Sequence, residues 1–122
     1  MKDWRRKEID IPIQYLKDAF EYKDGKLFWR HRPLEQFKSE KFMNVVNTKY
    51  AGKEAFANIN KQTGYAQGSI CGKLILRSVV IFALCNGRWP TRSVNHINEI
   101  KTDDRIENLR ETVRNKAVLR DE

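Results

Sequence analysis

The 122 residues carry a formal net charge of +8, a charged fraction of 33% and a hydrophobic fraction of 40%. This composition is too apolar for a wholly disordered chain, and no apolar run approaches the ~20 residues of a membrane span. The length fits one domain, residues 1–122, without a membrane partner. Cys71 and Cys85 lack the spacing of a zinc site, so we expect free thiols, no zinc and a cytoplasmic location.

The first half of the chain predicts a basic arm, a helix, a strand and a loop. Residues 1–9 have no apolar stretch behind their charges and form either a mobile arm or a phosphate contact. The side chains of this arm that would meet DNA are Trp4, Arg5, Arg6 and Lys7. Helical spacing predicts a helix from Ile13 to Tyr22, and the turn residues Asp24-Gly25 precede a strand at 26–30. Apolar residues without a clear period predict a long loop over 34–52, with room for one short helix.

The second half predicts a hairpin, a buried helix and a C-terminal unit. Strands at 64–70 and 73–76 form the hairpin. The apolar run within 78–86 predicts a buried helix closed by Gly87, although its β-branched residues leave a strand open. Short strands at 94–97 and 109–112, a polar loop between them and a helix at 113–120 follow. The expected fold is α+β, a small domain with a β-hairpin and helices.

Positive charge is concentrated in the middle of the chain. Residues 61–100 contain five basic side chains and one acid, Glu99, whereas residues 101–122 contain six of each sign. A basic face next to a neutral segment is typical of nucleic-acid binding, and equally of a merely soluble basic protein. The arginines that bracket the most informative segment, and that we expect to contact phosphates, are Arg77, Arg88 and Arg92.

That segment comprises Gly87–Pro90, Val94–Asn98 and Asp103–Arg110. A lone histidine is usually structural, but here a histidine on one strand is followed a dozen residues later by an asparagine on the next. Phosphodiester hydrolysis needs a base, a group that orients it and a divalent metal. The combination resembles the HNH endonucleases, in particular small phage-type and homing-type members. The resemblance is close over residues 87–114 and weaker upstream, at 15–17, 25–29 and 51–55.

The resemblance implies a ββα-metal finger over residues 87–120. The family's general base falls on His96 and the asparagine that orients it on Asn108. The two metal-ligand positions fall on Asn95 and Ala117, and an active site of this kind would use Mg²⁺ or Mn²⁺. Because Ala117 has no ligand atom and Asn95 is neutral, the metal half of the motif is degraded.

Further departures from the family pattern are Glu99 for glycine, Ser78 for histidine and Val113 for threonine. Glu99, Asp103 or Asp104 would have to supply a replacement carboxylate. Two hypotheses stay open: a phage-derived protein that has lost catalysis and binds DNA or a host protein as an inhibitor or regulator, and an active metal-dependent DNA endonuclease.

The remaining aromatic and charged residues have plainer roles. Trp29 and Trp89 are expected to pack in the core or within the motif, and His31 to lie on the surface. Arginines and acids near the C-terminus are expected to form a solvated face of salt bridges. The arginines are Arg105, Arg110 and Arg114, and their expected acidic partners are Asp103, Asp104, Glu107 and Glu111.

Overall fold

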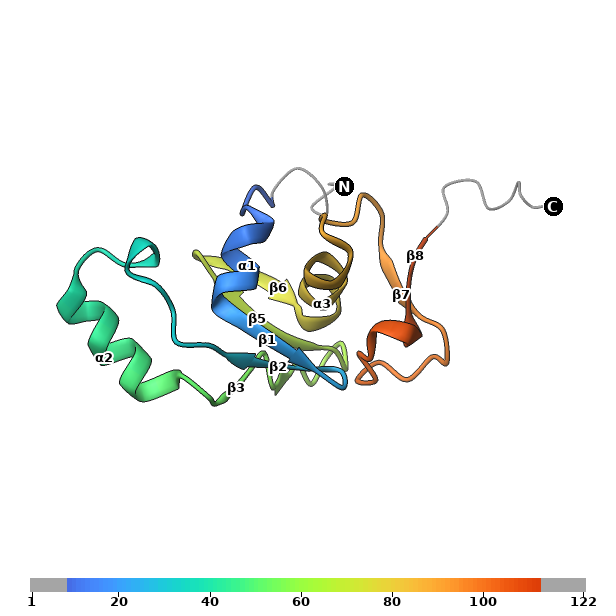
Figure 1. The fold of residues 1–122 in the computed structure, drawn as a ribbon. Helices are drawn as coiled ribbons and strands as arrows, with labels where there is room; N and C mark the ends of the chain where they lie inside the picture. Colours follow the sequence, from blue (N-terminus) through green and yellow to red (C-terminus); the bar gives the residue numbers. More distant parts are fainter. Residues whose placement is uncertain (1–8, 113–122) are drawn as a thin grey trace.

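The computed structural model describes residues 9–112, which form helices packed against three antiparallel sheets (Figure 1). The first sheet contains β1 (Phe20–Lys23), β2 (Lys26–Trp29) and β3 (Glu54–Ala55). The second contains β4 (Asn58–Ile59), β5 (Ala66–Ile70) and β6 (Lys73–Leu76). The third pairs β7 (Val94–His96) with β8 (Leu109–Glu111). The architecture is α+β, as predicted, and includes the predicted hairpin of β5 and β6.

Helix α3 (Arg77–Asn86) lies at the centre of the core. Its residues from Arg77 to Ala83 are all buried, and it contacts α1 (Ile13–Ala19), β2, β5 and β6. Figure 1 shows α1 and α3 side by side against the strands. The helix ends at Gly87, whose φ of 76° is left-handed and whose N–H donates to Ala83 O at 2.9 Å. The predictions of a buried helix and of its glycine cap are therefore confirmed.

The predicted helix over 13–22 is wrong at its C-terminal end. Helix α1 ends at Ala19, and Phe20 begins β1, paired with Trp29 of β2. The Phe20 side chain is 2% exposed and lies 4.7 Å from the Trp29 ring, centroid to centroid. Pairing with β2 and burial of this ring outweigh the helical spacing of the local sequence.

The predicted long loop over 34–52 is largely regular structure, and the helix for which the prediction left room is longer than expected. The segment contains the 3₁₀ turn η1 (Leu34–Gln36) and the helix α2 (Glu40–Tyr50). Ser39 caps α2 by accepting a hydrogen bond from Phe42 N at 3.1 Å. The prediction allowed one short helix without giving its bounds; in the structure the polar residue Asn47 is the only buried residue of α2.

Several contacts attach the β7–β8 unit to the body of the protein, three of them at its junctions with the segment before α1, with β1 and with the first turn. Trp89 Nε1 donates to Ile11 O at 2.6 Å, and Ile106 N donates to the Tyr22 hydroxyl at 2.9 Å. The turn at Gly25 approaches so closely that a Cβ there would lie 2.9 Å from Arg105 N. The expected packing role of Trp89 is confirmed, and the unit has a fixed place against the core.

Several predictions concern residues outside the described part of the chain. These are the arm residues Trp4, Arg5, Arg6 and Lys7, the helix at 113–120 and, within it, Val113, Arg114 and Ala117. Ile9, placed at the end of the expected arm, packs against the core. Cys71 and Cys85 are free, as predicted, and both are exposed. Among residues 9–112, no helix has the length and apolar character needed to cross a membrane.

Candidate functional site

The imidazole of His96 is held by a buried carboxylate. Its Nε2 lies 2.6 Å from Asp104 Oδ1, and the two side chains are 4% and 1% exposed. Arg77 Nε donates to the other oxygen, Asp104 Oδ2, at 2.8 Å. Because a carboxylate oxygen accepts hydrogen bonds, this contact favours the tautomer with the proton on Nε2, in which Nδ1 carries the lone pair. The arrangement fixes both the orientation and the tautomer of a potential base.

Arg77 belongs to this buried series of hydrogen-bonded ion pairs. Its guanidinium is therefore not available for the predicted contact with phosphates. Its side chain is 7% exposed, donates to Thr102 O at 3.1 Å and lies 3.6 Å from the carboxylate of Glu54. The prediction failed because it used charge alone, whereas the first residue of α3 faces the interior. Asp104 is committed in the same way, to His96 and Arg77, so its carboxylate is not free to replace a lost metal ligand.

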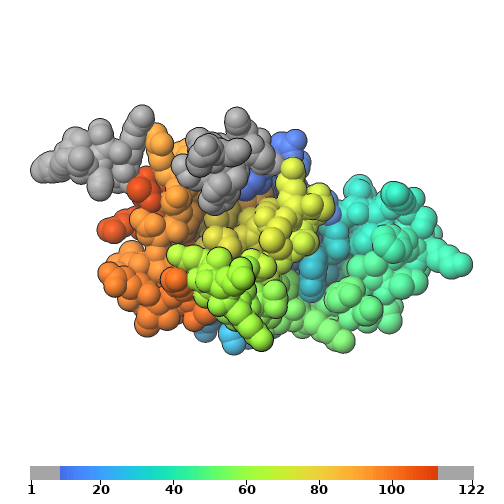
Figure 2. Space-filling model, turned by 180° about the vertical axis from the view of Figure 1, so that it is seen from behind, coloured from blue at the N-terminus to red at the C-terminus, as the bar shows by residue number. Residues whose placement is uncertain are grey.

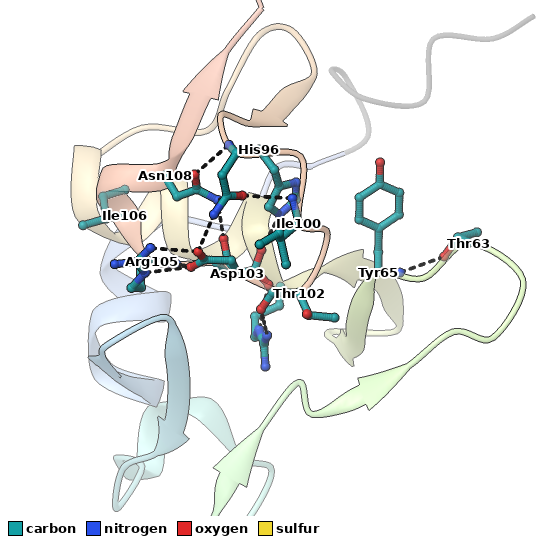
Figure 3. Close-up of polar contacts among 12 residues, drawn as sticks. Thr63, Tyr65, His96, Ile100, Thr102, Asp103, Arg105, Ile106 and Asn108 are labelled. Carbon is teal, nitrogen blue, oxygen red and sulfur yellow. Dashed lines mark hydrogen bonds and ion pairs between the residues drawn. The ribbon is translucent and has the colours of Figure 1, made fainter.

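Asn108 acts on the loop after His96, and its side chain does not contact the imidazole (Figure 3). Its Oδ1 accepts from Asn98 N at 3.0 Å, while its Nδ2 donates to Asn98 Oδ1 at 2.9 Å and to Asp103 O at 2.8 Å. The side chain is buried, so these bonds are well shielded from water. Asn108 thus fixes the loop that ends in Asp104, and Asp104 orients the ring.

A hollow of about 390 Å³ opens beside His96. Its lining consists of Tyr65, Asn95, His96, Ile97, Glu99, Lys101 and Arg110. The ring of Tyr65 stacks on the imidazole, with 5.7 Å between the ring centroids and 27° between the ring planes. Figure 3 shows the two side chains beside each other. Lys101 Nζ lies 5.1 Å from the centre of the Tyr65 ring and donates to Thr63 O at 2.9 Å. The hollow therefore joins one edge of the second sheet to the loop after His96.

Sequence reasoning missed Tyr65 and Arg110 as residues of this hollow. Tyr65 comes from the segment before β5, and no spacing in the sequence indicates that it reaches His96. Arg110 could have been predicted as a site residue, because pairing of the two expected strands places it opposite Asn95. Two cations, Lys101 and Arg110, thus face the hollow with a single carboxylate, Glu99.

The described residues do not fit the divalent-metal site that the motif implies. Asn95 is neutral, and its Nδ2 donates to Thr112 Oγ1 at 2.9 Å. Asp103 accepts two bonds from Arg105, both at 2.8 Å, which hold the pKa of its carboxyl well below the usual range. Glu99 is therefore the one expected replacement carboxylate that lines the hollow. Within residues 9–112, no three His, Cys, Asp or Glu side chains are grouped to hold a metal ion.

The other arginines differ in the ion pairs that they form. Arg88 donates to Glu111 at 2.7 Å, and Arg105 pairs with Asp103. The salt-bridge prediction is thus confirmed for Arg105, which pairs with Asp103 and lies 3.6 Å from the carboxylate of Glu107, but Glu111 pairs with Arg88. Glu111 also accepts from Thr91 N, Thr91 Oγ1 and Arg92 N. The bond from Arg88, followed by those from Thr91 and Arg92, lowers the pKa of Glu111 to about 2.

Comparison with known proteins supports the resemblance of the motif. Residues 76–118 match the family model described as HNH endonuclease. No curated protein and no solved structure matches the chain. The matched segment includes α3, the β7–β8 pair, His96 and Asn108, and it indicates a nuclease-like, DNA-related function. The segment from residue 76 to residue 118 is therefore similar to the HNH endonucleases.

Proposed function

We propose that this protein binds DNA through its HNH segment and that metal-dependent hydrolysis at His96 is impaired or lost. The observation that carries the proposal is the chemistry around the hollow. It keeps an oriented imidazole and two cations but offers one carboxylate, Glu99, where a hard cation needs several oxygen donors.

The cations of the hollow favour a phosphate-bearing partner. Lys101 and Arg110 line it, and Arg92 lines a second hollow of about 270 Å³ that shares Tyr65 and Asn95. Phosphates next to these side chains would release counterions, which favours binding and makes it sensitive to salt. Stacking of a base or sugar on Tyr65 would add contact area without selecting a sequence.

The proposed loss of catalysis follows from the missing negative charge at the metal-ligand positions, because the imidazole base itself is present. An imidazole can take a proton from water, but the negative charge that develops on phosphate must also be stabilised. Asn95 and Ala117 provide no negative charge with which to retain a divalent cation for that purpose. The side chain of His96 is also only 4% exposed, stacked beneath Tyr65, so water has little access to it.

An active endonuclease is the second candidate, and one observation favours it. The side-chain contacts from Arg77 to Asp104 and from Asp104 to His96 orient the imidazole and fix its tautomer, as a general base requires. In this case Glu99, together with Asn95 and phosphate oxygens, would supply the ligands for Mg²⁺ or Mn²⁺. Cleavage assays separate the two candidates.

The decisive experiment is plasmid cleavage with purified full-length protein in Mg²⁺ and separately in Mn²⁺. We expect little or no nicking in Mg²⁺, and the same result for His96→Ala. His31→Ala is the matched control, because His31 is the other histidine and is exposed. Robust nicking by the wild type and by His31→Ala, but not by His96→Ala, would refute the loss of catalysis and establish the second candidate.

The DNA-binding part is tested separately with a fluorescent duplex at low salt. We expect binding that weakens steeply with salt, and a salt slope that falls by about 2 in Lys101→Gln/Arg110→Gln, about one for each lost phosphate contact. If the wild type does not bind any duplex, DNA is not the partner. The proposed partner is then a host protein, which this chain would bind as a phage-derived inhibitor or regulator.

A further inference from the structure

Helix α2 projects from the body at the end of the molecule opposite the β7–β8 pair (Figure 1). In the space-filling view, residues 34–50 form a separate lobe, distant from the lobe of residues 90–110 (Figure 2). Asn47 is the only buried residue of the helix, and two of its large apolar side chains are more than half exposed: Phe42 at 54% and Val45 at 58%. Neither the core nor the candidate site explains why this helix is present.

The helix is nevertheless firmly attached, and by polar contacts. Asn47 Oδ1 accepts from Arg32 N at 2.8 Å, and Asn47 Nδ2 donates to Arg32 O at 3.0 Å. The Arg32 guanidinium lies over the rings of Trp29 and Phe37, at 5.0 and 4.7 Å from their centroids. An isolated helix of this length is marginal in water, so these contacts hold it in place. The body thus presents a rigid helix with one face uncovered.

The uncovered face has the composition of a groove-reading helix. At 100° per residue, five of the eight exposed residues of the helix fall within an arc of about 140°. These five are Lys41, Asn44, Val45, Thr48 and Lys49. The other three, Glu40, Phe42 and Tyr50, lie outside the arc. The face therefore combines two cations with an amide, a hydroxyl and apolar methyl groups.

Charge around the helix favours an anionic partner. Residues 30–53 contain six lysines or arginines and two glutamates, Glu35 and Glu40, an excess of four that equals half of the chain's net charge of +8. A protein-binding helix would instead show a broad apolar face with few cations. Lysine neutralises phosphates, asparagine pairs with adenine, and valine and threonine methyls contact the thymine methyl in the major groove.

We propose that α2 inserts its exposed face into the major groove of duplex DNA, as a second contact apart from the His96 hollow. The inference rests on the DNA binding proposed above and adds the element that positions the duplex. The helix is about 16 Å long and an α-helix fits a groove about 12 Å wide. Lys41 and Lys49 bind phosphates on either side, and Asn44, Val45 and Thr48 face the base edges.

The test measures affinity and salt slope of the full chain on a 30-base-pair fluorescent duplex. Lys41→Gln/Lys49→Gln is expected to weaken binding at least fivefold and to lower the salt slope by about 2. Gln has nearly the helix propensity of Lys, so circular dichroism should be unchanged. The control is Lys17→Gln/Lys23→Gln, which removes the same charge from exposed positions on α1 and β1.

A second variant tests the groove itself. Val45→Glu places a carboxylate at the centre of the face without removing a cation, and it should also weaken binding at least fivefold. Leu74→Glu is its control, because Leu74 is 65% exposed on β6, away from α2. If the wild type binds and both α2 variants bind like their controls, this inference is overturned while the proposed function stands. If the wild type does not bind duplex DNA, both fail.

Discussion

Replacement of Asp104 by asparagine should be the most destabilising conservative change in the candidate site. The carboxylate is 1% exposed and joins His96 Nε2, at 2.6 Å, to Arg77 Nε, at 2.8 Å. Asparagine has nearly the same shape but no charge. It would leave the buried guanidinium of Arg77 with Glu54, at 3.6 Å, as its remaining carboxylate among the described residues.

The magnitude follows from the burial of the pair. Removing one partner of a buried ion pair typically costs about 3–5 kcal/mol, because the other charge stays buried without compensation. Glu54 is partly exposed and relieves some of this penalty, so we expect a loss near 3 kcal/mol. For a domain of this size, each kcal/mol lowers Tm by about 4 °C, which predicts a decrease of about 12 °C.

Asp103→Asn provides a matched control, one residue away. It removes the same charge from an ion pair with Arg105, whose side chain is 47% exposed, so its effect on Tm should be far smaller. The assay is thermal and urea unfolding of both variants beside the wild type, with equal m-values required for comparison. Equal losses of stability, or a loss below about 1 kcal/mol for Asp104→Asn, would refute the buried-charge argument.

Three further changes follow from particular contacts. Because the pKa of Glu111 is lowered to about 2 in the folded protein, its contribution to stability is present above its unfolded pKa and is lost as pH falls through the folded value. Glu111→Gln should therefore flatten the decline of Tm with pH between about 4.5 and 2. Gly25→Ala should cost about 2 kcal/mol in urea unfolding, because φ is +83° and the Cβ would meet Arg105 N; an unchanged midpoint would contradict this packing. Asn108→Asp should cost about 1–3 kcal/mol by calorimetry, because both donated bonds are lost, and a neutral outcome would remove Asn108 as the brace of the loop.

The elements predictable from the sequence were those whose signals are local. The apolar run before Gly87 predicted α3 and its cap, and the spacing around His96 predicted the two strands of the β7–β8 pair and the resemblance to HNH endonucleases. The turn residues Asp24 and Gly25 located the turn and strand β2 after it, but not its partner β1. In each case the residues that decide the structure lie within about a dozen positions of one another.

The features that escaped prediction depend on contacts between distant segments. Phe20 joins β1 because its partner Trp29 buries it, although its own spacing is helical. Helix α2 is anchored by Asn47 to the backbone of Arg32, a polar attachment across 15 positions that apolar spacing does not reveal. Tyr65 reaches His96 across 31 positions of sequence, so nothing local could reveal it.

The buried charge chain bears on function as well as on stability. An apolar trio of the same volume would often stabilise a protein more than a buried ion pair does, so stability alone is a weak reason for Arg77, Asp104 and His96 to be there. Together with Glu54, these residues join β3, α3, β7 and the loop before η2 (Ile106–Asn108), and so fix how the HNH unit sits on the body. In a protein that only binds DNA, that placement matters while proton transfer does not. Asp104→Asn should then weaken DNA binding more than His96→Ala, whereas an active nuclease would lose cleavage equally in both.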